Sequence, residues 1–177
     1  MHGVEVSADA ASIANSKLGR EVVRVGNVSE SDLVEPSFDV CILADVIEHV
    51  RNPHDFIRSI RDMMHDRAVI YIATPSLDSW SARVLGRHWM EYKREHLFYF
   101  DKRTIGRLLG DLQFAAIQVS AGRKALTPNY IIGHFTKFPV PIVTNVLRSL
   151  AKVLPDKVLS HPISISASGI DVLATKI

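Results

Sequence analysis

The sequence has little cysteine and no glycine-rich loop. Its single cysteine, Cys41, excludes an internal disulfide framework and predicts a reducing, cytoplasmic location. Because Cys41 stands in an apolar run, we interpret it as a small core residue. No two glycines stand two positions apart, so the Gly-x-Gly fingerprint of dinucleotide and phosphate sites is absent from the 177 residues.

Several classes of partner also lack their usual signal. The net charge is only +2 and no basic run is dense, so nucleic acid is not predicted as a partner. The N-terminus has no secretory signal, and no apolar run reaches membrane-spanning length, so stable membrane insertion is not expected. The chain has no zinc-type Cys/His spacing, and His54 and His65 do not share a helix face, so no metal ligands are predicted.

What the sequence does contain is an alternation of strand and helix patterns from residue 3 to about residue 120. This alternation predicts an α/β fold with a mostly parallel sheet. Strands are expected over Gly3–Ser7, Glu21–Val25, Phe38–Ala44, Ala68–Ala73, Phe114–Ser120 and within Ile163–Ile177. Helices are expected from the cap Ser7 through Leu18, after the cap Asn52 with Pro53 in the first turn, over Ser79–Leu85, after the cap Asp101, and over Ile142–Leu154. A polar loop is expected over Ser29–Ser37, and the continuous apolar run Phe38–Ala44 predicts a strand buried on both faces.

The composition, 47% hydrophobic and 23% charged, is typical of a globular protein. A length of 177 residues suits one compact domain. We therefore expect a single domain over residues 1–177, in which residues 124–161 form an insertion before the final strand. The apolar character of that insertion predicts either a cover for a hydrophobic substrate or a surface helix packed on the sheet.

Polar residues follow the first two expected strands. Ligands of open α/β sheets bind beyond the carboxyl ends of the strands, so these positions are candidates for a site. Glu5 can accept hydrogen bonds from both hydroxyls of a ribose, or it can be a solvated turn carboxylate. Asn27 can accept a hydrogen bond from an adenine amino group, or it can be a polar turn residue after Gly26.

Two acids and a histidine follow the third strand in the run Asp45-Val46-Ile47-Glu48-His49. Asp45 and His49 are candidates for the edge of an active site, with His49 as a candidate general base. The alternative is an ordinary loop in which Glu48 and His49 pair with Arg51 or with solvent.

An aromatic segment with polar tips comes later in the chain. It comprises Trp89, Tyr92, Glu95, His96, Tyr99 and Phe100. Such a segment suits the wall of a small-molecule pocket. It can also be a minor hydrophobic cluster under a long connection, which is our interpretation of Trp89 and Phe100.

Taken together, ordered segments of the chain resemble the class I S-adenosylmethionine-dependent methyltransferases, in a small-molecule branch similar to ubiquinone-biosynthesis enzymes. The segments are GVEVSADAASIA, VRVGNV, FDVCILADVIEHVRNPHDFIRSIRDMM, AVIYIATPS, GRHWMEYKREHLFYFDKRTIGRLL and GIDVLATKI. The resemblance implies a Rossmann-like three-layer sandwich, a mostly parallel sheet with an antiparallel last strand, and S-adenosylmethionine as cofactor.

The resemblance also implies roles for individual residues. Cofactor binding falls to Glu5 at the ribose, Asn27 and Val28 at the adenine, and Asp45 near the methionine end, with Val6 and Ala44 beside them. His49, Tyr92 and His96 are implied to face the acceptor substrate, with His49 as the catalytic residue. Methyl transfer needs a base only where the attacking atom must lose a proton.

One part of the family pattern is missing from this sequence. The family's first strand and glycine-rich loop precede the segment that resembles GVEVS, which here begins at Gly3. Three explanations remain open: an N-terminal truncation, pairing of the exposed sheet edges with another copy, or a non-catalytic member. The expected function is methyl transfer to a small or lipid-like acceptor, with oxygen as the expected acceptor atom. The alternative is a methyltransferase-like fragment or interaction module that no longer binds cofactor.

Overall fold

The N-terminal residues fold as a small β-α-β unit. The computed structural model describes residues 1–28, 38–166 and 168–177, so the loop expected over Ser29–Ser37 lies outside the described residues. Strand β1 (Gly3–Glu5) pairs in parallel with β2 (Val23–Val25), and helix α1 (Ala8–Leu18) connects them. As predicted, the Ser7 side chain caps α1, and Gly19 ends it in the left-handed conformation at φ 64°.

The main sheet lies beside this unit and has four strands in the order β3-β4-β8-β5. They are β3 (Phe38–Ala44), β4 (Met64–Pro75), β8 (Gly169–Lys176) and β5 (Phe114–Ala121). Strand β3 pairs in parallel with β4, whereas β8 is antiparallel to both of its neighbours. The predicted α/β class with an antiparallel last strand is therefore confirmed, as a mixed sheet.

Two amphipathic helices supply the core with their apolar faces. Helix α2 (Pro53–Asp62) is capped by Asn52 and has proline in its first turn. Helix α4 (Lys102–Asp111) begins with a capping box between Asp101 and Thr104. Their buried side chains pack with alternate residues of the sheet in one cluster, which includes Ile57, Ile60, Ile105, Leu109, Ile70, Ile72, Val172 and Ala174.

The other face of the main sheet is open among the described residues. Val40 and Ile42 of β3 are 57% and 66% exposed, and Leu173 of β8 is 44% exposed. The prediction that Phe38–Ala44 is buried on both faces is therefore wrong. These exposed side chains show that the third layer of the expected three-layer sandwich is not complete in residues 1–28, 38–166 and 168–177.

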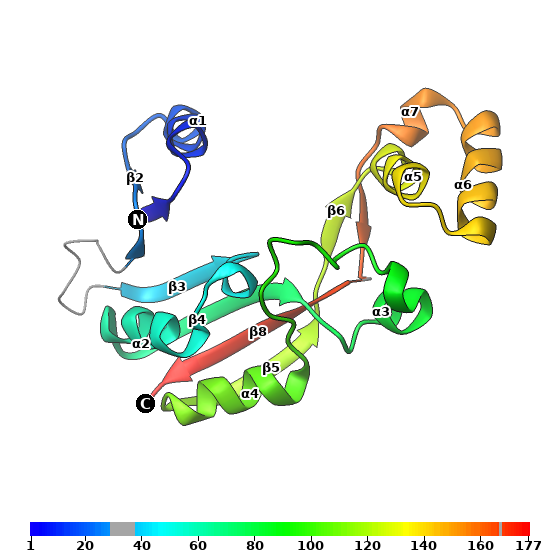
Figure 1. Cartoon of the computed structure of the whole chain (residues 1–177). Helices are drawn as coiled ribbons and strands as arrows, with labels where there is room; N and C mark the ends of the chain where they lie inside the picture. The colour runs from blue at the N-terminus through cyan, green and yellow to red at the C-terminus, as the bar shows by residue number, and fades with distance from the viewer. Residues whose placement is uncertain (29–37, 167) are drawn as a thin grey trace.

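The carboxyl ends of β3, β4 and β5 point to the same end of the molecule (Figure 1). Three short elements lie at or near this end: the 3-10 helix η2 (Ile47–His49) after β3, then α3 (Trp80–Leu85) and the 3-10 helix η3 (Gly86–His88) after β4. An irregular segment leads from η3 to α4 and carries the aromatic residues. This end therefore gathers most of the chemistry-bearing side chains singled out in the sequence.

A helical layer stands beyond the same end of the sheet (Figure 1). Between β5 and β8 the chain forms β6 (Lys124–Leu126), α5 (Pro128–Lys137), α6 (Pro141–Val153), α7 (Asp156–Leu159) and β7 (Ile163–Ile165). Strands β6 and β7 pair antiparallel and connect this layer to the main sheet. Within the part of the chain that the structure describes, no helix is long and apolar enough to cross a bilayer.

Candidate functional site

Asp45 stands at the turn that follows β3. Its backbone has a φ of 51°, in the left-handed region that only short polar residues and glycine tolerate well. The backbone N–H donates to the Ala73 carbonyl at 2.9 Å, which fixes the turn against the end of β4. Local strain of this kind clusters at functional sites, and here it projects the Asp45 side chain beyond the sheet.

The Asp45 carboxylate takes part in a charge cluster with residues from two distant segments. The Lys124 ammonium, on β6, donates to Asp45 Oδ1 at 2.9 Å and lies 3.6 Å from Glu91 Oε1. Lys93 also lies 3.3 Å from Glu91 Oε2. The pKa of Lys124 is raised: its burial opposes the rise, but the hydrogen bond to Asp45 and the two carboxylates outweigh it. Lys124 is therefore charged at neutral pH.

An apolar cavity of about 510 Å³ adjoins the charge cluster. Its polar end is formed by Asp45, Glu91, Lys93 and Lys124, and its walls come from α3, β6, α5 and α6. The wall residues include Trp80, Val84, Leu126, Tyr130, Ile131, Phe135, Val143 and Leu147. A cavity with this volume and an apolar lining that ends in a few polar groups suits a small organic molecule.

Glu48 is the most deeply buried charged residue near this end of the sheet, with no exposed surface. Thr74 Oγ1, at the end of β4, donates to Glu48 Oε2 at 3.0 Å. The Glu48 carbonyl accepts from the backbone N–H groups of Leu97 and Phe98 at 2.8 and 3.2 Å. Burial raises the pKa of the Glu48 carboxyl. The alternative in which Glu48 pairs with Arg51 or with solvent is therefore wrong, because the side chain turns inward.

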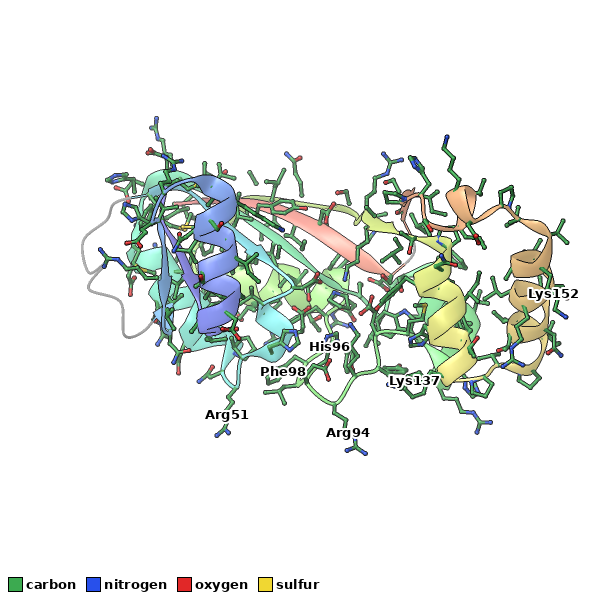
Figure 2. The ribbon with its side chains drawn as sticks, turned by 90° about the horizontal axis from the view of Figure 1, so that it is seen from above. Arg51, Arg94, His96, Phe98, Lys137 and Lys152 are labelled. Atoms are coloured by element: carbon green, nitrogen blue, oxygen red, sulfur yellow. The ribbon has the colours of Figure 1, made fainter. Side chains whose placement is uncertain are left out.

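His49 and His96 come together although they are far apart in the sequence. Their rings meet edge to face with centroids 4.8 Å apart. His49 Nδ1 lies 2.9 Å from the Glu95 carbonyl, so this nitrogen carries the proton and donates it. His96 is buried, which lowers its pKa, and Lys93 and His49 act in the same direction. Figure 2 shows His96 near the middle of the molecule, while Arg94 of the same segment points away from it.

The aromatic segment forms a connected set of rings. Tyr99 lies 5.8 Å from His96 and 5.2 Å from Tyr92, centroid to centroid. Trp89 is 2% exposed and its indole N–H donates to Ser81 Oγ at 3.0 Å. Trp89 is buried outside the main core cluster, as the interpretation as a minor cluster expects. Phe100 is 7% exposed but belongs to the main core cluster, so that interpretation is wrong for it. The three residues expected to face an acceptor, His49, Tyr92 and His96, are thus joined through Tyr99.

The residues expected to hold the cofactor are divided between two places. Glu5, Val6, Asn27 and Val28 belong to the N-terminal unit, and Glu5 Oε1 accepts from the Ser7 backbone N–H at 2.9 Å. Ala44 and Asp45 belong to the main sheet. Between the two lies an apolar groove of about 380 Å³. Of the six residues expected to hold the cofactor, only Val28 lines this groove.

That groove is bordered by β3 on one side and by the first residues of the chain on the other. Its lining includes Val4, Val28, Val40, Ile42 and Leu43. The rings of His2 and Phe38 meet across it at 5.8 Å. Of the β3 side chains that line it, Val40 and Ile42 are exposed although the sequence predicted their burial, whereas Leu43 is buried in the core.

Three site residues were not singled out from the sequence, namely Glu91, Lys93 and Lys124. Lys124 follows Arg123 and precedes Ala125 in the sequence, and a lysine in such a place is usually solvated. Their contact depends on how β6 folds back over β3, and no local pattern encodes this. The sequence did contain one signal of a site at this place. Glu48 is an acid that follows an apolar strand and stands next to Ile47.

Comparisons with known proteins agree with this architecture. The family described as "Methyltransferase domain" matches residues 1–119, about two thirds of the chain. No curated protein sequence matches. A solved Thermotoga maritima S-adenosylmethionine-dependent methyltransferase, described as a possible histamine N-methyltransferase, is 16% identical with a TM-score of 0.64, covering 99% of this chain and 72% of that one.

Two further solved structures show the same fold. A putative methyltransferase from Bacillus halodurans is 14% identical, covers 98% of this chain and 81% of that one, and has a TM-score of 0.62. Phosphoethanolamine N-methyltransferase 2 from Haemonchus contortus, solved with phosphomonomethylethanolamine and S-adenosylhomocysteine, is 17% identical. That match covers 99% of this chain and 43% of that one, with a TM-score of 0.58. The family match over most of the sequence, together with the fold, shows that this chain belongs to the methyltransferase domain family, whose members use S-adenosylmethionine.

Proposed function

We propose that this chain transfers a methyl group from S-adenosylmethionine to a small or lipid-like acceptor, with oxygen as the acceptor atom. The observation that carries this proposal is the apolar cavity of about 510 Å³ that ends at Asp45. Asp45 is the residue to which the family resemblance assigns the methionine end of the cofactor. An apolar molecule in the cavity would therefore present its end to the place where the methyl group is expected.

The residue roles in this proposal follow the strand ends. Glu5 binds the ribose hydroxyls, with Val6 beside it, and Asn27 and Val28 bind the adenine. Ala44 and Asp45 line the methionine side. His49, Tyr92 and His96 do not line the cavity, so in this proposal they contact the end of the acceptor that reaches beyond Asp45. His49 removes a proton from a hydroxyl as its oxygen attacks the methyl carbon and the carbon–sulfur bond breaks. Alignment of the two reactants supplies much of the rate of such a transfer.

The helical layer gives the cavity its apolar wall, which supports a lipid-like acceptor. Val143 and Leu147 of α6 face the cavity, while Val146 of the same helix is 54% exposed. We propose residues 124–161 as the insertion that covers the acceptor, within a single domain over residues 1–177. In this proposal the layer covers the acceptor, in place of the alternative of a surface helix packed on the sheet.

A matched pair of substitutions on α6 tests this cavity. Val143→Trp places a large ring in the cavity, so binding of an apolar fluorescent reporter such as anilinonaphthalene sulfonate should fall about tenfold or more. Val146→Trp adds the same ring on the exposed side and should leave binding within about twofold. Equal effects of the two substitutions on reporter binding, measured by fluorescence titration, would remove the support for an acceptor in this cavity.

The apolar groove supports a second candidate function, a non-catalytic module that associates through its sheet edges. Val40 and Ile42 are exposed on β3 beside a groove of about 380 Å³, and exposed strand edges favour pairing with another chain. In this candidate a second copy of the chain covers the groove. Sedimentation velocity of the wild type and of Ile42→Lys tests it. A dimer that Ile42→Lys converts to monomer supports association, and a wild-type monomer at all concentrations contradicts it.

A further inference from the structure

Two buried polar atoms beside η2 have no hydrogen-bond partner among the described residues. They are Glu48 Oε1 and His96 Nδ1. The Glu48 side chain is fully buried and that of His96 is 9% exposed. Buried polar groups are satisfied in the great majority of folded proteins, so a pair of orphaned atoms at one place calls for a physical explanation.

His49 completes the group. One ligand atom from each of Glu48, His49 and His96 lies within 4.8 Å of the other two. A carboxylate oxygen and two imidazole nitrogens are a donor set that divalent transition metals bind well. His49 is exposed, so an ion can reach the group from solvent.

Neighbouring groups already orient two of the three side chains. Thr74 Oγ1 donates to Glu48 Oε2, which leaves Oε1 as the free oxygen of that carboxylate. The Glu95 carbonyl accepts from His49 Nδ1, which leaves Nε2 of the ring as the nitrogen with a lone pair. A carbonyl or hydroxyl behind each ligand is the usual outer support of a protein metal site.

We propose that Glu48, His49 and His96 form a binding site for one divalent transition-metal ion, such as Zn²⁺ or Co²⁺. A tetrahedral ion with bonds of about 2.1 Å holds its ligands about 3.4 Å apart. From separations of up to 4.8 Å, the three atoms therefore need to close by at most about 1.4 Å, which side-chain rotation supplies. Three protein ligands leave a coordination position open, as in catalytic rather than structural sites.

The open position suggests what the ion does. An ion there would bind a hydroxyl oxygen of the acceptor and lower the pKa of that hydroxyl. This role rests on the proposed function and narrows the acceptor to molecules with a hydroxyl group that reaches η2. It replaces proton removal by His49, because the only lone pair of that ring would then be bound to the ion. Binding of the ion does not rest on it and is measured without cofactor or acceptor.

Titration of the chelator-treated, dialysed full chain with Co²⁺ tests the site. Calorimetry gives the stoichiometry, and the visible absorption of bound Co²⁺ reports nitrogen ligation. We expect one Co²⁺ per chain, displaced by Zn²⁺. His49→Asn and His96→Asn should each weaken binding by about tenfold or more. The control is His54→Asn, which removes an exposed histidine that lies 3.7 Å from the Asp55 carboxylate. It should leave binding unchanged.

Absence of saturable binding by a folded wild-type chain would overturn the proposal. So would binding that survives both His49→Asn and His96→Asn, because the ion would then sit elsewhere. If His96→Asn fails to fold by circular dichroism, His49→Asn decides alone, since that side chain is exposed. A separate titration with S-adenosylhomocysteine distinguishes the two proposals: Co²⁺ binding without S-adenosylhomocysteine binding keeps the metal site and removes the methyl transfer.

Discussion

The Lys124 ammonium lies 2.9 Å from Asp45 Oδ1 and so connects the helical layer to the turn that follows β3. Lys124 belongs to β6, and Asp45 follows β3, the strand that pairs with β4. Because the same ammonium lies 3.6 Å from the buried Glu91, it is shared by two carboxylates at the polar end of the cavity.

Replacing that cation should cost stability. Lys124→Met leaves Asp45 and Glu91 without their shared partner, and we expect the free energy of unfolding to fall by about 1–2 kcal/mol. The figure is modest because Asp45 is half exposed. Lys152→Met, on the exposed surface of α6, is the matched control and should change stability by less than about 0.5 kcal/mol. Urea denaturation followed by circular dichroism measures both, and equal effects would mean that Lys124 does not bind the two carboxylates.

Much of the local structure follows from the sequence. Ser7, Asn52 and Asp101 were predicted as helix caps and each accepts a backbone N–H at the start of its helix. Caps and apolar periodicity act within a few residues, so a sequence reports them directly. The strand Phe38–Ala44 was placed correctly for the same reason.

The site was predictable only in part. The turn residues Asp45 and His49 were found because they follow an apolar strand. The Glu48–Thr74 hydrogen bond and the His49–His96 contact join residues that are far apart in sequence, and strand order alone brings them together. The burial of β3 was mispredicted because an apolar run indicates that a strand favours burial. The actual exposure of the strand depends on which other elements cover it.

Gly169 provides a second test of stability, at the start of β8. A Cβ built there would lie 2.9 Å from the Thr74 carbonyl oxygen, a backbone atom that cannot move away cheaply. Gly169→Ala should therefore lower the free energy of unfolding by about 1–3 kcal/mol. Gly106→Ala is the control, because its Cβ meets nothing within 4 Å and alanine favours a helix. It should raise stability by about 0.5–1 kcal/mol. Equal losses would show that β8 and Thr74 are not in close contact.

His134 on α5 should make the helical layer sensitive to acid. Burial lowers the pKa of this imidazole below its ordinary 6.5, and Lys93 and Lys137 act in the same direction, against Glu91. The unfolded chain therefore takes up the proton first as the pH falls. Stability is fully present above about pH 6.5 and declines as the pH falls toward the folded pKa.

His134→Gln removes this source of acid sensitivity. The variant should lose less stability than the wild type between about pH 7.5 and pH 5, measured by urea denaturation in the presence of chelator. His161→Gln, an exposed position after α7, should follow the wild type. A wild-type curve and a His134→Gln curve that run parallel across this range would contradict the lowered pKa.

The central claim is that this chain binds the cofactor of its family with Asp45 at the methionine end. Calorimetric titration of the folded 177-residue chain with S-adenosylhomocysteine tests it most directly. We expect saturable binding of one molecule per chain, weakened about tenfold or more by Asp45→Asn, since hydrogen bonds to a charged group contribute about 1.5–3 kcal/mol. A folded chain that shows no heat of binding, or an Asp45→Asn variant that binds as tightly as the wild type, would contradict the account.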